Sequence, residues 1–373
     1  MKILLTCLAL CAFAAAPAAA QAQTVPPSFF STNWDGEIAK NAGDQLRDAE
    51  WKRMTDTGVG STRTNFDWVT AEPRKGVYRW TTIDDLVSVA TRNRIELLPV
   101  VMNAPPWARE RSGNFGSPPK DPNDYASFVT ALIQRYGPDG LFWTLHPELE
   151  KRPLRIWQIW NEPHLKFQWD SKPGEDYAKG YGKLLRVAYK AIHKADPGAQ
   201  VVLAGLANRS YAYLASLYRR GKIHGFFDVA ALHPYTVKAS GVIELTKRFK
   251  GIMRKFHDSA KPVWITELGL PASKKKIKSN STLQTTDAGL AKFITASYRA
   301  LVKARGSNTT RVDRVYQYTW ASVYCCEQFR FTGLLQYDNK DSVEPKPAYQ
   351  AYLDAARQYG AAPPAPAARS SAW

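Results

Sequence analysis

The chain has 373 residues, of which 51 are Lys or Arg and 33 are Asp or Glu, and its formal net charge is +18 at pH 7. Apolar residues make up 45% and charged residues 23%, which excludes a mainly disordered, collagen-like or coiled-coil chain. Only four residues are Cys, so the composition also argues against a disulfide scaffold and a zinc ribbon.

Residues 1–22 have the pattern of a secretory signal peptide. Lys2 supplies a positive start, residues 3–15 form an apolar run, and small residues at 18–22 suit cleavage. A membrane anchor is the alternative, but the run is shorter than the ~20 residues that span a bilayer. We therefore expect a secreted or periplasmic protein with no membrane span. Its mature part would keep two adjacent cysteines, at 325–326, as free thiols or as one strained vicinal disulfide.

Eight short, β-rich runs alternate with eight longer amphipathic runs along the rest of the chain. We expect strands at 28–32, 60–64, 96–101, 155–160, 201–204, 228–233, 263–267 and 314–319. We expect helices at about 39–57, 82–94, 123–136, 176–195, 210–220, 241–258, 285–305 and 346–358.

This alternation predicts an α/β protein with a parallel sheet. Eight units over this length predict a single-domain (β/α)8 TIM barrel over residues 23–358. The alternative is an open doubly wound sheet, which usually carries a glycine-rich phosphate loop after its first strand. The sequence has neither a G-x-G-x-x-G nor a Walker motif. Residues 359–373 are rich in Ala and Pro without periodicity, so we expect a flexible tail there.

Two of the expected strands deliver a glutamate at their carboxyl ends. The fourth runs into W-Q-I-W-N-E-P at 157–163, with Glu162, and the seventh into V-W-I-T-E-L-G at 263–269, with Glu267. Polar residues at the carboxyl ends of barrel strands are catalytic candidates. Glycosidic cleavage needs one carboxyl group to protonate the leaving oxygen and a second to attack or to activate water. Two surface acids at the starts of loops are the structural alternative.

These two motifs resemble those of the clan A retaining glycoside hydrolases, and the pattern is similar to family 39 and family 5-like enzymes over residues 28–356. The resemblance implies a double displacement in which Glu162 is the general acid/base and Glu267 is the nucleophile. It also implies that Asn161 binds the 2-hydroxyl of the sugar. Retention requires the two carboxyl groups to lie ~5–5.5 Å apart.

The resemblance gives further roles to residues at other strand ends. It implies that Tyr235, in an H-P-Y element, donates to Glu267 and that His233 lines the sugar subsite. It implies that Arg63 supports the nucleophile electrostatically. It also implies that Trp320 lies beneath the sugar bound in the −1 subsite. For His233, Arg63 and Trp320, the structural alternatives are a core histidine, a surface arginine and a core tryptophan.

Three residues in loops are candidates for sugar contacts by their position alone. Asn103 ends the third expected strand, Trp107 follows it, and Trp169 lies in the loop after Glu162. An amide can bond sugar hydroxyls and an indole can stack on a pyranose face. Loop packing is the alternative for each aromatic residue.

These features together predict a secreted, endo-acting retaining β-glycosidase that hydrolyses a polysaccharide or an oligosaccharide. A transglycosylase and a non-catalytic carbohydrate-binding barrel stay open as alternatives. Family 39 xylosidases usually carry a further β-sandwich domain, and the chain has no length for one after residue 360, which weakens a xylosidase assignment.

The remaining features bear on cofactors and partners. The retaining mechanism needs no cofactor, and the six His include no H-x-x-x-H pair, so we expect no metal site. We expect a monomer that binds no nucleic acid, since the sequence carries no nucleic-acid-binding signature. The +18 charge fits either an anionic glycan partner or a basic, solvated surface.

Overall fold

The computed structural model describes residues 25–34, 43–111, 113–323, 327–338 and 342–360. The expected signal peptide, Cys325 and Cys326, and residues 361–373 of the expected tail lie outside the described residues. Within the described residues, every helix falls short of the length and apolar content that a membrane span requires.

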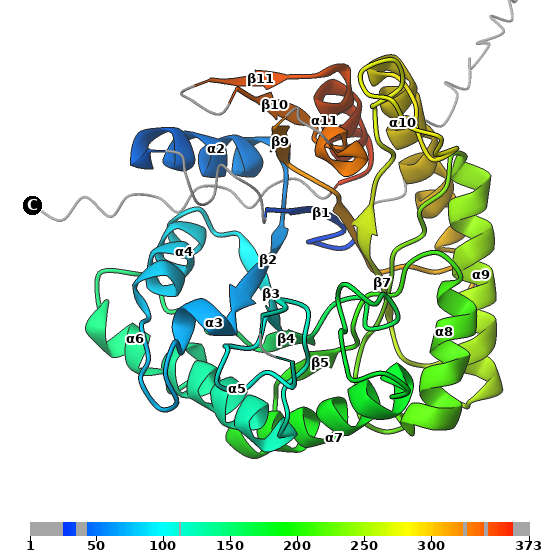
Figure 1. The fold of residues 1–373 in the computed structure, drawn as a ribbon. Helices are drawn as coiled ribbons and strands as arrows, with labels where there is room; N and C mark the ends of the chain where they lie inside the picture. The colour runs from blue at the N-terminus through cyan, green and yellow to red at the C-terminus, as the bar shows by residue number, and fades with distance from the viewer. Residues whose placement is uncertain (1–24, 35–42, 112, 324–326, 339–341, 361–373) are drawn as a thin grey trace, which may run out of the picture.

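Eight parallel strands form the centre of the molecule, and helices surround them (Figure 1). The sheet order is β5-β4-β3-β2-β1-β8-β7-β6. Two parallel bridges, Val202↔Val229 and Leu206↔Leu232, join its two edges and close the barrel. The predicted (β/α)8 barrel is therefore confirmed. The strands are β1 (Phe30–Asn33), β2 (Ser61–Asp67), β3 (Glu96–Met102), β4 (Ile156–Ile159), β5 (Gln200–Val202), β6 (Ala230–Leu232), β7 (Val263–Leu268) and β8 (Arg314–Gln317).

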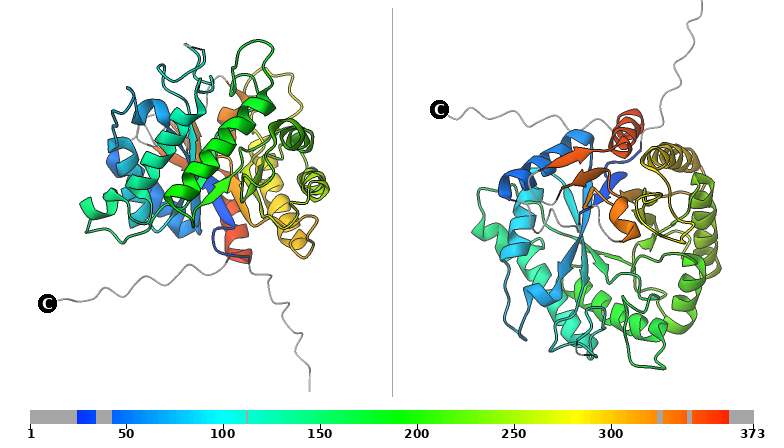
Figure 2. Two further views of the ribbon diagram at one scale, coloured as in Figure 1. Left: turned by 90° about the horizontal axis from the view of Figure 1, so that it is seen from below. Right: turned by 45° about the horizontal axis from the view of Figure 1, so that its top comes forward.

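A helix follows each strand and packs on the outside of the barrel (Figure 2). The eight helices agree with the expected ranges to within a few residues, except that 39–42 lie outside the described residues. They are α2 (Asp44–Thr57), α4 (Thr81–Arg92), α5 (Pro122–Tyr136), α7 (Tyr177–Ala195), α8 (Ser210–Ser216), α9 (Ala239–Lys255), α10 (Asp287–Ala304) and α11 (Pro347–Tyr359). A π-helical segment, η1 (Leu217–Gly221), continues α8.

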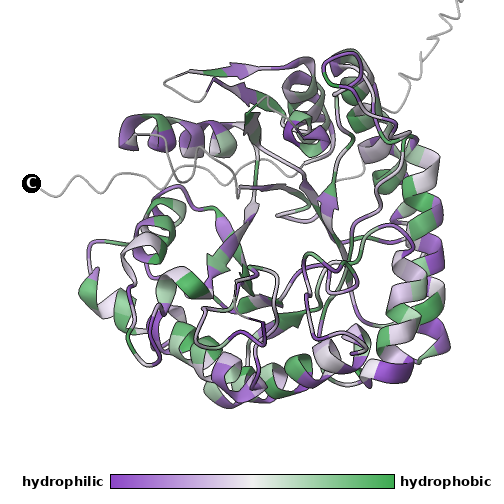
Figure 3. Ribbon diagram, in the orientation of Figure 1, coloured by the Kyte–Doolittle hydropathy of each residue, from purple (hydrophilic) through white to green (hydrophobic). Residues whose placement is uncertain are grey.

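Local chemistry explains where several of these helices begin. The side chains of Asp121, Asp176 and Thr286 accept hydrogen bonds from backbone N–H groups in the first turns of α5, α7 and α10, which satisfies donors that the helix itself leaves unpaired. Hydrophobic and hydrophilic residues are mixed along the outer helices in Figure 3. In α7 the apolar residues Leu184, Leu185 and Ile192 are all buried against the barrel.

Some short elements have no counterpart in the prediction. The helices α3 (Trp68–Ala71), α6 (Leu141–Leu145) and η2 (Gln328–Phe331) are about one turn long. A second sheet, β9 (Ala321–Val323), β10 (Leu335–Tyr337) and β11 (Val343–Pro345), follows β8 and lies beside α11. Segments of three to five residues contain too little of a hydrophobic period to be predicted from sequence.

The barrel interior changes from apolar to polar along the strands. Its apolar layer consists of buried side chains from β3 to β8: Leu98, Ile156, Val202, Val229, Ala231, Trp264 and Tyr316. Because side chains alternate between the two faces of a strand, a residue two positions later points to the same interior. That next position holds Gln158 on β4 and Thr266 on β7, both fully buried. The interior therefore becomes polar toward the carboxyl ends of the strands, where barrel active sites form.

Candidate active site

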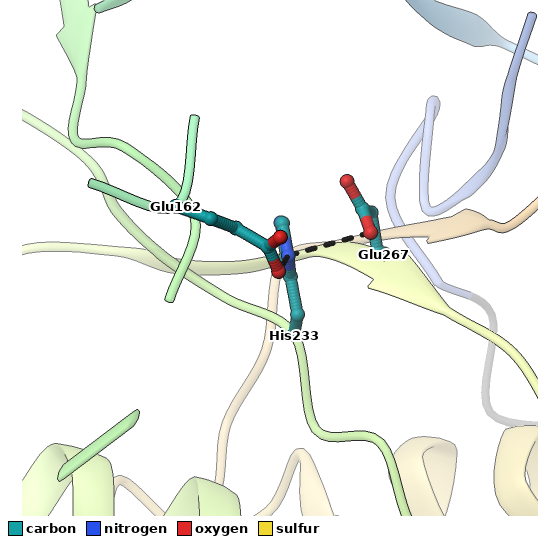
Figure 4. A group of neighbouring side chains, drawn as sticks. All are labelled: Glu162, His233 and Glu267. Atoms are coloured by element: carbon teal, nitrogen blue, oxygen red, sulfur yellow. Dashed lines mark hydrogen bonds and ion pairs between the residues drawn. The ribbon is translucent and has the colours of Figure 1, made fainter. Parts of the chain in front are cut away.

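Glu162 and Glu267 face each other at the carboxyl ends of β4 and β7 (Figure 4). Both residues are largely buried, with exposed fractions of 8% and 7%. One oxygen from each glutamate and one ring nitrogen of His233 all lie within 4.8 Å of one another. The barrel therefore brings together the two carboxyl groups that lie more than a hundred residues apart in the sequence.

A sharp backbone bend after β4 aims Glu162 into the barrel mouth. Trp160 and Glu162 have φ angles of +64° and +42°, a left-handed conformation that costs a non-glycine residue ~1–3 kcal/mol. Hydrogen bonds from Trp160 N to Val101 O (3.1 Å) and from Glu162 N to Gly205 O (3.2 Å) hold the bend. Strain that is held in place by neighbouring strands is typical of functional sites.

Glu267 is held by two donors, one to each carboxyl oxygen. Arg63 Nη1 donates to Oε1 at 2.9 Å, and Tyr235 Oη donates to Oε2 at 2.6 Å. Burial and the nearby charge of Glu267 raise the pKa of Tyr235 well above its usual value of 10, so Tyr235 stays a protonated donor. The positive guanidinium and the phenol both stabilise negative charge on Glu267.

Arg63 is itself fixed by a network of buried side chains. Its Nε donates to Gln158 Oε1 (2.8 Å), its Nη1 to Asn33 Oδ1 (2.7 Å) and its Nη2 to Asn161 Oδ1 (2.8 Å). Arg63 is 3% exposed, so it is not a surface arginine. The network links Glu267 to Asn161, the residue that precedes Glu162. Asn33 and Gln158 were not among the predicted site residues, although both are polar residues at inward positions of apolar strands, a signal that the sequence contains.

His233 lies close to both glutamates. It has no exposed surface, and the expectation that it lines the sugar subsite stays a prediction. Its Nδ1 lies 2.8 Å from Glu162 Oε1 and 3.4 Å from Glu267 Oε2, and its Nε2 lies 3.0 Å from Thr266 Oγ1. Gly205 leaves room for the ring, since a Cβ there would lie 1.9 Å from Nε2. His233 thus lies beneath the two carboxyl groups and contacts both.

Trp320 lies among buried side chains. It has no exposed surface, and its Nε1 donates to Glu50 Oε2 on α2 at 2.9 Å. The indole also contacts Tyr349 of α11 edge to face. Glu50 is itself buried, and this burial raises its pKa. Trp320 therefore packs between α2 and α11, and the sugar contact expected for it stays a prediction.

The three loop candidates differ in their exposure. Trp169 is 5% exposed and packs edge-on against Trp160 and Tyr181, and the sugar-stacking role expected for it stays a prediction. Asn103 and Trp107 are half-buried. Asn103 Nδ2 donates to Asp67 Oδ1, and Trp107 Nε1 donates to Glu72 O at 3.0 Å. Both retain surface for a ligand, and their roles stay predictions.

Three phenylalanines that were not among the predicted site residues are exposed. Phe115 lies in the loop after β3, Phe167 in the loop after β4, and Phe329 in η2. Phe115, Phe167 and Phe329 are 62%, 67% and 40% exposed. Phe329 lies edge-on to Tyr235, with the ring centroids 5.2 Å apart, and therefore lies near Glu267. Phenylalanines are common in cores, so exposure could not be inferred from their identity.

Glu162, His233 and Glu267 are also close enough together to be considered as metal ligands. Their present contacts fit a hydrogen-bonded group instead. Both oxygens of Glu267 already accept hydrogen bonds, one of them from the guanidinium of Arg63. A fixed positive charge at that distance opposes the binding of a second cation.

The family model "Glycosyl hydrolase catalytic core" matches residues 118–347, which is more than half of the chain. The chain belongs to this family. It is therefore a glycoside hydrolase, and a carbohydrate substrate follows from that activity. No curated protein sequence matches the chain.

Solved structures of other glycoside hydrolases share the fold of this glycosyl hydrolase. A family 39 glycoside hydrolase from the gut symbiont Bacteroides cellulosilyticus WH2 is 19% identical, with a TM-score of 0.60 over 89% of this chain and 64% of that one. The GH5_18 protein from Streptomyces cattleya, in complex with GlcNAc, is 15% identical, with a TM-score of 0.64 over 91% and 81%. Xylanase 10B from Thermotoga maritima is 14% identical, with a TM-score of 0.59 over 89% and 95%. These likenesses concern the (β/α)8 fold, and the chain spans 64% of the family 39 protein's length.

Proposed function

We propose that this glycoside hydrolase is a retaining β-glycosidase that cleaves within a polysaccharide, with Glu267 as nucleophile and Glu162 as acid/base. We further propose that residues 23–358 act as one catalytic domain in a secreted or periplasmic monomer. The signal-peptide pattern at 1–22 supports the location.

The spacing of the two carboxyl groups carries the proposal. Their facing oxygens lie within 4.8 Å. Retaining enzymes hold their carboxyl groups ~5–5.5 Å apart, whereas inverting enzymes need ~6.5–9.5 Å to admit a water molecule between carboxylate and sugar. The short separation therefore favours direct attack by Glu267 on the anomeric carbon.

The reaction then has two steps. Glu267 attacks the anomeric carbon while Glu162 gives its proton to the glycosidic oxygen; the glycosidic C–O bond breaks and a glycosyl ester forms on Glu267. Glu162, now a carboxylate, next takes a proton from water. The water oxygen bonds to the anomeric carbon and the ester bond breaks, which restores both glutamates.

The surrounding residues prepare the two glutamates for these roles. Arg63 and Tyr235 stabilise the charge that makes Glu267 a nucleophile. His233 Nδ1 holds Glu162 from below and lies near Glu267. Arg63 also fixes the amide oxygen of Asn161, so the Nδ2 group of that amide points away from Arg63 and can donate to a sugar hydroxyl. We include Asn103 and Trp107 as further sugar contacts, supported by their exposure at the end of β3.

Release of reducing ends from neutral and acidic polysaccharides tests the proposal, with the wild-type protein and Glu267→Gln side by side. The amide cannot act as the anionic nucleophile, so we expect the rate to fall ~1,000-fold or more. Matched circular dichroism spectra would confirm that the variant folds. A variant that releases reducing ends at the wild-type rate would disprove the nucleophile assignment.

A further inference from the structure

A pocket of about 420 Å³ lies where α8 and η1 meet the start of α7, and arginines and tyrosines line most of it. The arginines are Arg209, Arg219 and Arg220, and the tyrosines are Tyr177 and Tyr213, with two small residues between them. The proposed reaction uses none of these side chains. The pocket therefore needs an explanation of its own.

The pocket shares a wall with the loop that carries the proposed acid/base. Glu162 and His164 are two residues apart, so at most ~7 Å of chain separates them. The ring of His164 stacks on Tyr213 with centroids 4.2 Å apart and an interplanar angle of 27°. Tyr177 lies edge-on to Tyr213 across the pocket, at 6.4 Å. A glycan of several sugars bound across the two carboxyl groups is long enough to reach it.

The charge of the pocket is positive. Arg220 Nε pairs with Asp176 at 3.2 Å. Arg209 and Arg219 are both exposed, and neither forms an ion pair with any acidic group among the described residues. Arg209 hydrogen-bonds the phenol of Tyr211, which carries no formal charge. The His164 ring adds no charge, because burial lowers its pKa to about 3. No carboxylate among the described residues therefore neutralises these two guanidinium groups, and their planar donor sets match carboxylate, sulfate and phosphate groups.

The two tyrosines indicate that the anion is part of a sugar. An aromatic ring offers an apolar face with a polar end, and the apolar face of a pyranose packs on such a surface. A pocket for a free inorganic anion would need the arginines alone. The combination of ring faces and guanidinium groups fits a sugar residue that carries a negative charge.

We propose that this pocket is a distal subsite for an acidic sugar residue of the polysaccharide substrate, one that bears a carboxylate, a sulfate or a phosphate. The inference rests on the proposed glycosidase function and adds the chemical class of one substrate residue. The net charge of +18 would further raise the rate at which a polyanionic substrate reaches the protein.

Binding measured on the full chain with Glu267→Gln, which prevents turnover, tests this subsite. The probes are oligogalacturonates, hyaluronan and chondroitin sulfate oligosaccharides and phosphorylated mannan oligosaccharides, each beside a counterpart of equal length without the anionic groups. We expect at least one acidic probe to bind ~10-fold or more tightly than its neutral counterpart. Adding Arg209→Gln and Arg219→Gln should remove that preference. The acidic probe that binds more tightly than its neutral counterpart identifies the anion as carboxylate, sulfate or phosphate.

The matched control removes two cations from the opposite end of the barrel, with Lys151→Ala and Arg152→Ala ahead of β4, and should leave the preference intact. Equal binding of acidic and neutral probes would overturn the subsite. So would an equal loss in the control variant, or binding of inorganic polyphosphate as tight as that of the acidic glycans. The reducing-end assay gives a result that does not depend on the binding measurement. Release of reducing ends by Glu267→Gln at the wild-type rate would refute the catalytic proposal. Unchanged binding of acidic probes in the arginine variant would refute only the subsite.

Discussion

Glu162 and Glu267 lie close together in unlike surroundings. Both oxygens of Glu267 accept hydrogen bonds, from Arg63 and Tyr235. Glu162 instead contacts His233, and among the described residues no guanidinium forms a hydrogen bond or an ion pair with it. A double displacement requires this asymmetry, because one carboxylate must stay ionised to attack while the other must carry a proton.

For Glu162→Ala we expect the loss of activity to depend on the leaving group. Polysaccharide cleavage should fall ~100-fold or more, because a poor leaving group needs protonation. An activated aryl glycoside needs little protonation, and azide fits the space that the side chain vacates, so azide should restore part of its turnover as a glycosyl azide. Product analysis by mass spectrometry checks this. Equal losses on both substrates without azide rescue would contradict the acid/base role.

Tyr235→Phe should lower kcat ~10–100-fold, the effect of losing one hydrogen bond to a charged group. The lost donor destabilises the carboxylate of Glu267, so the acidic limb of the pH–rate profile should move to higher pH. In the wild type, the pKa of Tyr235 lies well above 10 because of burial and the Glu267 charge. Its ionisation should therefore cause no loss of rate below pH 10. An unchanged acidic limb in the variant would argue against the contact.

At the scale of elements, the site depends on how closely the carboxyl ends of β4, β5 and β6 approach each other. Gly205 follows β5, accepts the Glu162 N–H and leaves space for the His233 ring. His233 N in turn donates to Leu206 O. The loop after β5 thus positions residues of two neighbouring strands without contributing a reactive group of its own.

Gly205→Ala should therefore destabilise the protein and reduce its activity. The added Cβ would lie 1.9 Å from His233 Nε2 in a buried site, and such overpacking costs ~1–3 kcal/mol. Gly251→Ala in α9 is the matched control, since a Cβ there meets nothing within 4 Å and alanine stabilises a helix by ~0.5–1 kcal/mol. Urea unfolding measures both. Equal stability of Gly205→Ala and wild type would show that the ring has room to move.

At the scale of the whole molecule, a buried histidine makes stability depend on pH. His164 has a pKa of about 3 because of burial and the nearby His233, against an unfolded value of ~6.5. As the pH falls below ~6.5, the unfolded chain takes up a proton that the folded protein does not. Stability should therefore fall between pH 6.5 and pH 3, by ~2 kcal/mol at pH 5 for this group.

His164→Phe keeps the stacked ring on Tyr213 and removes the titrating group. We expect its free energy of unfolding to change less between pH 7.5 and pH 5 than that of the wild type, by ~2 kcal/mol. Denaturant unfolding at the two pH values provides the measurement. His257→Asn, at an exposed position, should behave like the wild type. A parallel loss of stability in His164→Phe and wild type would assign the pH dependence to other groups.

The order of strands and helices, and the two glutamates at strand ends, could be predicted from local sequence patterns. Hydrophobic periodicity and capping act over a few residues, so the eight units could be recognised locally. A glutamate directly after a Trp-rich strand is likewise a local feature, and barrel geometry implied that two such strand ends would meet.

Which side chains are exposed, and what they contact, depends on how distant segments of the chain pack together. Trp320 is buried because its indole meets Glu50, a residue 270 positions away in the sequence, and His233 is enclosed because Gly205 leaves it space. The exposure of Phe115, Phe167 and Phe329 also depends on loops from different strands. Burial is the sum of contacts between distant segments, and no local pattern encodes that sum.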